Sequence, residues 1–527
     1  MGDKYDRQLR LWGPEGQRRL ANTHVLLVGS SATASEALKN LVLPGVGRFT
    51  ILDDATVSLA DASNNFFVTA AAVGQSRAEA VAKLLLEMNS DVAGGARHAN
   101  IKQVLQDEPQ YLDQFSLVLA IQLDMAATSK LAELCLGKRI PLLLVTSYGF
   151  LGSLRLQAAQ HAIADAKLDP PRHELRLSKP FPTLQKFADS FYLKALSSIE
   201  HAHVPFVVLL LQAMKKWKEG HDGQPPATFP EKDAFKKSLQ EMAWGPPGHE
   251  LNFIEAAENA YKAYVAPQVP EEVAPVLEAA SAHTVSVETL EKTKDTKEFW
   301  LLAHSLADFV KKNDGLLPVT GVVPDMTAST ESYVALQELY VNKAKEDATK
   351  VHEILRQRLR ELKLPEDSIS FEAVAAFCKN ASSVGMLETR TVAQEYKHVD
   401  LSSVDLEDED KEQSPLIWYF MLRAVAAFAA EFNRYPGSED SAATQDGTWL
   451  VSKAKKLAAG SDVAAWITND HALEMIRSCQ VELHNIAALM GGVAAQEAVK
   501  LITHQFEPLN NTYLFNGISG VAATYQL

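Results

Sequence analysis

The chain has 527 residues, of which 47% are hydrophobic and 22% are charged, and its formal net charge is −15. This length predicts about two to four domains with ample core, and the composition is that of an ordinary soluble protein. The acidic balance argues against a general nucleic-acid binder, which needs a basic face, and favours protein partners. No apolar run approaches the roughly 20 residues of a membrane span, and the polar N-terminus lacks a signal-peptide core. We therefore expect neither a nucleic-acid nor a membrane partner.

The three cysteines, Cys135, Cys378 and Cys479, are far apart and odd in number. They can form neither a disulfide framework nor a Cys-x-x-Cys zinc site, so we expect a reducing compartment, the cytoplasm or the nucleus. Cys135 and Cys378 fall at apolar helical positions, which predicts core residues rather than nucleophiles. Cys479, with His484 five residues further on, is a candidate thiolate.

The N-terminal stretch from Tyr5 to Trp12 is predicted to be a short amphipathic helix that ends at Gly13-Pro14. Arg7 lies away from its apolar face. Its guanidinium could reach a phosphate in its own chain or in a partner's chain. The alternative is an exposed helix arginine with no partner.

Residues 24–54 have the order of a nucleotide-binding strand–helix–strand unit. A short apolar run ends at Gly29, hydroxyl side chains from Ser30 to Ser35 can cap the helix that follows, and a second strand is closed by Asp53 and Asp54. Gly45-x-Gly47 follows a helix and is predicted to stop it rather than to hold a phosphate.

The glycines that this nucleotide-binding fingerprint requires after the first strand are missing. They allow backbone amides to approach a phosphate closely, whereas every residue from Ser30 to Ser35 carries a Cβ. Asp53 and Asp54 could hold a ribose hydroxyl or a metal, but without the glycine loop we favour a solvent-facing pair at the end of the strand. A nucleotide-dependent enzyme with an atypical phosphate loop remains the alternative.

Alternating patterns continue to about residue 165. Strands are predicted at 117–121, 141–146 and 150–157, with helices at 77–88 and 131–136. This order predicts an α/β fold with a mostly parallel sheet and helices on both faces.

Helical patterns dominate from about Asp169 onward and predict a large, mainly helical insert. The predicted helices cover 206–217, 233–242, 251–264, 299–310, 332–361 and 371–378. His201-x-His203 could ligate a metal, but no further ligand lies at ligand spacing, so a surface or linker pair is predicted and no metal site is expected.

An acidic stretch from Val404 to Glu412 is predicted to be a solvated loop, and a helix follows at 416–432. The α/β pattern then returns, with a helix at 485–503 and strands at 512–515 and 521–526. Small residues from Met490 to Glu497 predict that this last helix lies close against the sheet. We place the first part of the α/β domain at 1–165, the insert at 166–400, its acidic loop and helical remainder at 401–478, and the closing part at 479–527.

Several motifs spread along the chain identify a family resemblance. They are Tyr5–Gly13, Leu38–Gly45, Asn64–Phe67, Gly491–Glu497, Asn510–Tyr513 and Ala522–Leu527. Together they resemble the regulatory subunits of the heterodimeric activating enzymes for Nedd/Rub-type ubiquitin-like modifiers, over the whole length of the chain. The resemblance implies a Rossmann-like adenylation fold, interrupted by an insert similar to one half of a catalytic-cysteine domain.

The same resemblance implies that this half is inactive. Active adenylating members have a Gly-rich loop, an Asn-Arg-Gln triplet after the second strand and an aspartate at the end of the fourth. Those places are taken here by Ser30 to Ser35, Ser63-Asn64-Asn65 and Gln122, and Arg77 stands where a phosphate-contacting lysine is expected. We therefore expect no catalytic residue, metal or cofactor on this chain.

The resemblance also implies partners. The catalytic subunit would carry ATP, Mg²⁺ and the catalytic cysteine, and Arg7 would reach across into its ATP site. Further partners would be the Nedd/Rub-type modifier and, through the complex, a conjugating enzyme. The partner contacts implied by the family are Pro324, Asp325, Met326, Tyr333, Leu336 and Leu339. The remaining alternative is a pure scaffold that takes no part in the chemistry.

Overall fold

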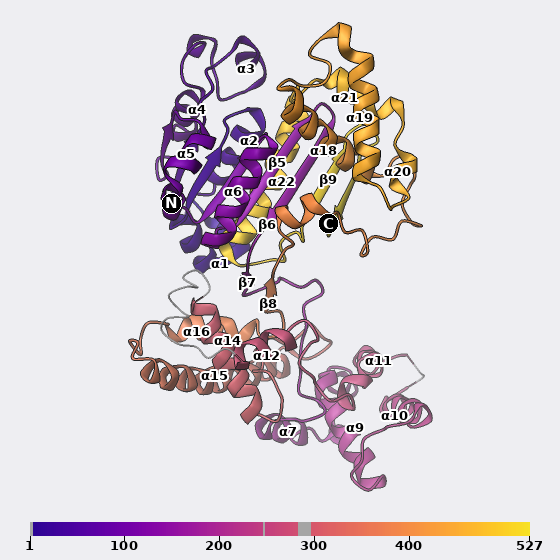
Figure 1. The fold of residues 1–527 in the computed structure, drawn as a ribbon. Coiled ribbons are helices and arrows are strands. Elements are labelled where there is room, and N and C mark those ends of the chain that lie inside the picture. Colours follow the sequence, from indigo (N-terminus) through magenta and orange to yellow (C-terminus); the bar gives the residue numbers. More distant parts are fainter. Residues whose placement is uncertain (1–3, 246–247, 283–296) are drawn as a thin grey trace. The chain divides into compact units, whose positions relative to one another are not determined.

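The computed structural model describes residues 4–245, 248–282 and 297–527, so Met1 to Asp3 lie outside the described residues (Figure 1). The chain divides into two units. Unit 1 comprises residues 1–161 and 386–527, and unit 2 comprises residues 162–385.

Unit 1 contains an eight-stranded sheet with the order β10-β9-β6-β5-β4-β1-β2-β3 (Figure 1). The strands are β1 (His24–Val28), β2 (Arg48–Leu52), β3 (Ala93–Arg97), β4 (Leu117–Ile121), β5 (Leu142–Tyr148), β6 (Leu151–Gln157), β9 (Thr512–Asn516) and β10 (Val521–Tyr525). Strands β1 to β5 pair in parallel, whereas β6, β9 and β10 join them antiparallel. The predicted α/β class with a mostly parallel sheet is confirmed.

Helices cover both faces of this sheet because its strands are apolar on both sides. In unit 1 they are α1 (Asp6–Ala21), α2 (Ala32–Val42), α3 (Leu59–Asn64), α4 (Arg77–Leu86), α5 (Ile101–Asp107), α6 (Met125–Lys138), α17 (Val392–Lys397), α18 (Pro415–Phe432), α19 (Ala443–Leu457), α20 (Val463–Trp466), α21 (Asn469–Ser478) and α22 (His484–Thr503). Leu26 and Val28 of β1 pack with Leu131 of α6. The predicted end of the first helix is instead a kink inside α1, where Gly13 has φ +70°.

Helices α2 and α22 of unit 1 pack closely against each other. A Cβ added at Gly491 would lie 2.7 Å from the backbone nitrogen of Ala37 and 2.7 Å from Cβ of Glu36. Gly152 of β6 likewise leaves room for Met490, whose sulfur would be 2.2 Å from an added Cβ. The small residues of α22 therefore allow close approach to a helix as well as to the sheet.

Two described helices, α18 and α22, are long and apolar enough to cross a membrane by length and composition. The sequence had predicted no stretch approaching that length. In the structure 56% of the α18 window and 67% of the α22 window are buried inside the protein. Ile417 and Phe420 of α18, for example, lie in the same apolar cluster as Leu514 of β9. Both are therefore core helices of unit 1.

Residues 386–478 belong to unit 1, although the sequence placed 166–400 and 401–478 in the insert. The reason is the packing of α18 on the sheet, since helical periodicity does not show which core a helix covers.

Strand β3 was also not predicted, because its Gly94-Gly95 pair resembles a turn. Gly94 is needed in this strand, since a Cβ there would lie 2.3 Å from the Phe49 ring.

Unit 2 is mainly helical, as predicted. Its helices are α7 (Pro182–Asp189), α8 (Ser198–His201), α9 (Phe206–Gly220), α10 (Phe229–Met242), α11 (Leu251–Glu258), α12 (Ala274–Ala282), α14 (Lys297–Lys312), α15 (Thr330–Glu361) and α16 (Phe371–Lys379). Two short strands, β7 (His161–Ile163) and β8 (Gly385–Leu387), pair where the chain leaves and re-enters unit 1.

The predicted surface pair His201-x-His203 is wrong for its first member. His201 is 1% exposed, its ring stacks on Trp244 at a centroid distance of 4.0 Å, and its Nδ1 lies 2.8 Å from Oε1 of Glu250. His203 is exposed. Burial of His201 follows from its place on α8 beside the aromatic core, so it is a core histidine and not a metal ligand.

Replacing Gly491 by valine tests the contact between α2 and α22. We expect the free energy of unfolding to fall by about 1–3 kcal/mol, because the new side chain meets backbone atoms that cannot move aside. The measurement is urea denaturation. The matched control is Gly492→Ala, where an added Cβ meets nothing within 4 Å and where alanine favours the helix. Equal effects of the two substitutions would contradict this close contact.

Candidate functional site

A cleft of about 840 Å³ lies at the carboxyl ends of the parallel strands. Its walls include Gly29 after β1, Asp53 after β2 and Gln122 after β4. Strand order 3-2-1-4-5 reverses direction between β1 and β4, and open α/β sheets bind ligands at this switch point. The cleft is therefore in the position of a nucleotide site. Gly29, with φ +92°, is the residue here that uses a left-handed conformation to turn from strand to helix.

The first turn of α2 is capped differently from the prediction. Ser31 stands at the N-cap position but makes no capping hydrogen bond with its own side chain. Instead its Oγ donates to Oε1 of Glu482 at 2.9 Å, and the backbone nitrogen of Thr33 donates to Oε2 at 3.3 Å. The predicted hydroxyl cap is thus wrong, and the capping group is a carboxylate from the connection between α21 and α22.

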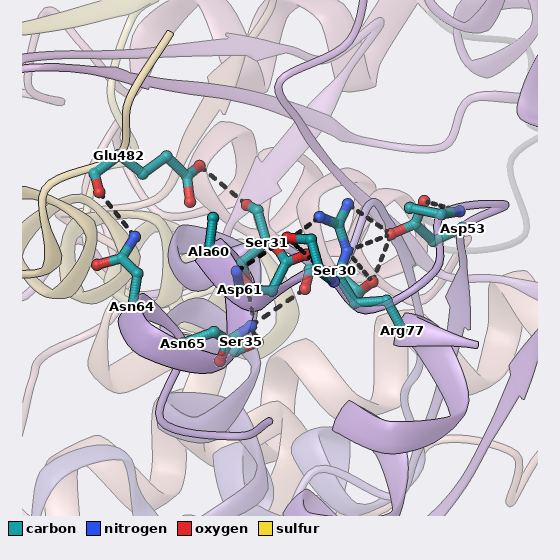
Figure 2. Close-up of polar contacts among 12 residues, drawn as sticks. Ser30, Ser31, Ser35, Asp53, Ala60, Asp61, Asn64, Asn65, Arg77 and Glu482 are labelled. Atoms are coloured by element: carbon teal, nitrogen blue, oxygen red, sulfur yellow. Dashed lines mark hydrogen bonds and ion pairs between the residues drawn. The ribbon is translucent and has the colours of Figure 1, made fainter. Parts of the chain in front are cut away.

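Arg77, at the first position of α4, lies between two carboxylates (Figure 2). Its Nη2 lies 2.9 Å from Oδ2 of Asp53, and its Nη1 lies 2.9 Å from Oδ1 of Asp61. Its Nε also donates to Oγ of Ser30 at 3.1 Å, and Ser30 Oγ in turn donates to Asp53. Arg77 is therefore fully engaged by groups of its own chain.

The predicted solvent-facing pair is correct only for Asp54, which is exposed and accepts from Asn100 at 2.6 Å. The Asp53 side chain is only 9% exposed. The sequence did not reveal this, because Arg77 follows Asp53 by 24 residues and only the fold brings them together.

The protonation of this cluster follows from its contacts. Burial lowers the pKa of the Arg77 guanidinium, but attraction to Asp53 and then Asp61 outweighs burial, so the pKa is raised. Burial raises the pKa of Asp61, yet hydrogen bonds from Ser58 and the charge of Arg77 lower it overall. Both groups are therefore charged at neutral pH.

The asparagines at the triplet position, and Gln122 after β4, also form hydrogen bonds within the chain. Asn64 Nδ2 donates to the carbonyl oxygen of Glu482 at 2.7 Å. Asn65, 3% exposed, donates to Oγ of Ser35 at 2.9 Å. Gln122, with φ +57°, donates to the carbonyl oxygen of Ser147. Each of these neutral amides therefore bonds to another part of unit 1, and none of them supplies a charge to the cleft.

Two contributors to the site were missed by sequence reasoning, Glu482 and Asp61. Ser58 and Asp61 form a capping box that starts α3; the Ser-x-x-Asp spacing was a usable signal. Glu482 gave no such signal, because it lies 451 residues after the serine it contacts.

The three cysteines do not form a nucleophilic site. Burial raises the pKa of Cys135 to about 12, and burial followed by the charge of Asp347 raises that of Cys378 to about 12. Cys479 borders the cleft and is half-buried; burial raises its pKa as well, with Arg434 acting in the opposite direction. Both buried thiols stay protonated at neutral pH.

His484, the candidate base, instead places Nδ1 3.1 Å from the carbonyl oxygen of Asn64. Within the described ranges, no group of three metal-ligating side chains comes together.

The remaining predicted site residues lie outside the cleft. Arg7 is exposed on α1, and its guanidinium has no hydrogen-bond or ion-pair partner within the described part of the chain. In unit 2, Asp325 is exposed, while Pro324, Met326, Tyr333 and Leu339 are half-buried. Leu336 is fully buried in the core of unit 2, so its side chain is not available to a partner and that prediction is dropped.

Comparisons with known proteins agree with this geometry. The ThiF family matches residues 5–524. The NEDD8-activating enzyme E1 regulatory subunit of Danio rerio is 35% identical over 531 residues, covering 99% of this chain and 98% of that protein. The chain belongs to the ThiF family and, within it, groups with the NEDD8-activating enzyme E1 regulatory subunits. Among the other members of this family, the subunit AXR1 of Arabidopsis thaliana is 35% identical, covering 98% of this chain and 94% of that protein. The Drosophila melanogaster subunit is 35% identical, covering 99% and 97%. The resemblance and the Rossmann-like adenylation fold are confirmed.

Replacing Arg77 by alanine tests the ion cluster of the cleft. The change leaves Asp53 and Asp61 together without their cation, so we expect the free energy of unfolding to fall by about 3 kcal/mol at pH 7. Folding lowers the pKa of Asp61 from its unfolded value of 3.8. The stabilisation that ionised Asp61 contributes is therefore complete above pH 3.8 and is lost as the pH falls through the pKa of the folded state. The difference between wild type and variant should therefore shrink below about pH 4.

The matched control is Arg10→Ala, which removes an exposed arginine paired with Asp6. Urea denaturation should show a change within about 0.5 kcal/mol for this variant. An Arg77→Ala variant as stable as Arg10→Ala would contradict the assigned pairing.

Proposed function

We propose that this chain is the regulatory, non-catalytic subunit of a heterodimeric enzyme that activates a NEDD8-type ubiquitin-like modifier. The names of the relatives support an activating enzyme and a regulatory role. The observation that carries the non-catalytic part is the state of the cleft. Arg77 and the first turn of α2, the two groups suited to a phosphate, are both bonded to carboxylates of the same chain.

In this proposal the chemistry takes place on the partner subunit. That subunit binds ATP and Mg²⁺, adenylates the C-terminal glycine of the modifier, and transfers the modifier to its own cysteine as a thioester. A conjugating enzyme then receives it, in the cytoplasm and the nucleus. The raised pKa values of the buried thiols, about 12 for Cys135 and for Cys378, support a cysteine on the other chain.

Arg7 is the residue we propose to act across the interface. The start of its helix is fixed by Tyr5, whose hydroxyl lies 2.9 Å from Oδ2 of Asp91. The Tyr5 ring lies so close to Gly45 that a Cβ there would be 2.8 Å from it. Lys4 pairs with the same aspartate at 2.8 Å. This anchoring holds the backbone two residues before Arg7, so its guanidinium extends into solvent from a fixed base and can add positive charge to a partner's triphosphate.

We propose that the partner also contacts unit 2 around Pro324, Asp325, Met326, Tyr333 and Leu339. Two further residues of α15 extend this surface, Val334 and Val341, which are 45% and 54% exposed. They are seven residues apart and so lie on the same side of the helix.

The test of this function is reconstitution with a catalytic subunit of a NEDD8-activating enzyme. We expect co-purification as a heterodimer, ATP–pyrophosphate exchange that depends on the modifier, and a thioester on the catalytic subunit. This chain alone should give neither exchange nor thioester. Exchange by this chain alone would favour the nucleotide-dependent enzyme instead.

Replacing Arg7 by alanine should slow ATP–pyrophosphate exchange by the assembled heterodimer roughly 100-fold, the usual cost of removing one preorganised donor to a developing charge. The heterodimer should still co-elute in gel filtration. The control is Arg10→Ala, on the same helix, which should leave exchange unchanged. If Arg7→Ala also leaves it unchanged, the chain is a scaffold without a part in the chemistry.

A further inference from the structure

The connection between α21 and α22 crosses one side of the cleft and places a carboxylate at the start of α2 (Figure 2). Glu482 accepts from the hydroxyl of Ser31 at 2.9 Å and from the backbone nitrogen of Thr33 at 3.3 Å. Its two oxygens thus engage a hydroxyl and an amide of the same helical turn, while Ser31 makes no capping bond of its own.

This turn has the position and chemistry of an anion site. It follows the first parallel strand, lies at the switch point of the sheet, and presents backbone N–H groups that have no partner within the helix, at the positive end of an 11-residue helix. A carboxylate carries the charge and the acceptor oxygens that a phosphate would bring. Glu482 therefore supplies the negative charge and the hydrogen-bond acceptors that a phosphate would otherwise supply at this turn.

The carboxylate is held in place by its own backbone. The carbonyl oxygen of Val481 accepts from the backbone nitrogen of Gly149 at 2.8 Å, and that of Glu482 accepts from Asn64 Nδ2 at 2.7 Å. Just before them, Cys479 and Gln480 have φ of +37° and +65°, which turns the connection sharply. These contacts fix Glu482 against β5, the end of α3 and the start of α2.

We propose that Glu482 is an internal ligand, an autoinhibitory contact that occupies the anion position of the cleft and so excludes phosphate groups from α2. The cleft has a volume of about 840 Å³, so its size alone does not exclude a phosphate. Exclusion comes from charge: a phosphate at this turn meets a carboxylate already bonded there, and the nearest arginine, Arg77, is held by Asp53 and Asp61. Removing the carboxylate frees the donors of the first turn.

The test uses the full chain and inorganic pyrophosphate as the probe. The melting temperature is followed against pyrophosphate concentration, with potassium chloride at matched ionic strength as the reference. In Glu482→Ala we expect stabilisation by pyrophosphate with an affinity about tenfold above that of wild type, the scale of one favourable charge at a helix N-terminus. The charge-matched control is Glu507→Ala, an exposed site outside the cleft, which should behave as wild type.

A second variant separates loss of the contact from loss of the charge. Ser31→Ala removes the hydroxyl and leaves the carboxylate, so it should gain no affinity for pyrophosphate. If Glu482→Ala does not fold, Glu482→Gln, which keeps the size of the side chain, is measured in the same way with the same expected gain. A variant at Glu482 that folds but binds pyrophosphate no better than Glu507→Ala would show a structural cap alone and overturn the proposal.

Discussion

The ion pairs of Arg77 with Asp53 and Asp61 decide what this cleft can bind. All three side chains are largely buried, with 20%, 9% and 17% exposed, so separating them leaves charges in a poorly solvated place, which costs several kcal/mol. A phosphate would have to take Arg77 away from two carboxylates and would then lie beside them with a charge of the same sign. Arg77 is positively charged, but its charge is already paired with the two carboxylates.

The fold itself does not need a nucleotide. The hydroxyl residues that replace the phosphate-loop glycines make contacts within the fold instead. Thr33 joins α2 to β5 by donating to Ser147 at 2.9 Å, and Ser35 donates to the carbonyl oxygen of Ser31 at 2.9 Å within the first turn of α2. The packing of α22 on α2 completes the same region from the other end of the chain. Unit 1 thus keeps the architecture of an adenylation domain while the polar groups at the carboxyl ends of its strands bond to one another, which fits the non-catalytic role proposed above.

Local sequence patterns were sufficient to predict much of the fold of unit 1 and the loss of its phosphate loop. The strand–helix–strand unit around Gly29, the helix predicted at 332–361 and the absence of phosphate-loop glycines all follow from periodicity and from the Cβ argument. What failed depends on contacts between distant segments. The burial of Asp53 needs Arg77, the burial of His201 needs Trp244, and the assignment of residues 386–478 to unit 1 needs the packing of α18 on the sheet. Spacing along the chain contains none of these pairings. Leu336 was assigned to the partner surface from the family resemblance, and a motif match does not show which side chains of α15 are buried in the core of unit 2.

The most direct test of the account is equilibrium binding of ATP with Mg²⁺ to the purified chain by isothermal titration calorimetry, without a partner subunit. With Arg77 paired and Glu482 at the start of α2, we predict no binding heat up to millimolar ATP, the concentration range at which nucleotides saturate dedicated sites. A dissociation constant in the micromolar range, with nucleotide protecting the residues around Ser30 and Ser31 from hydrogen exchange, would contradict it.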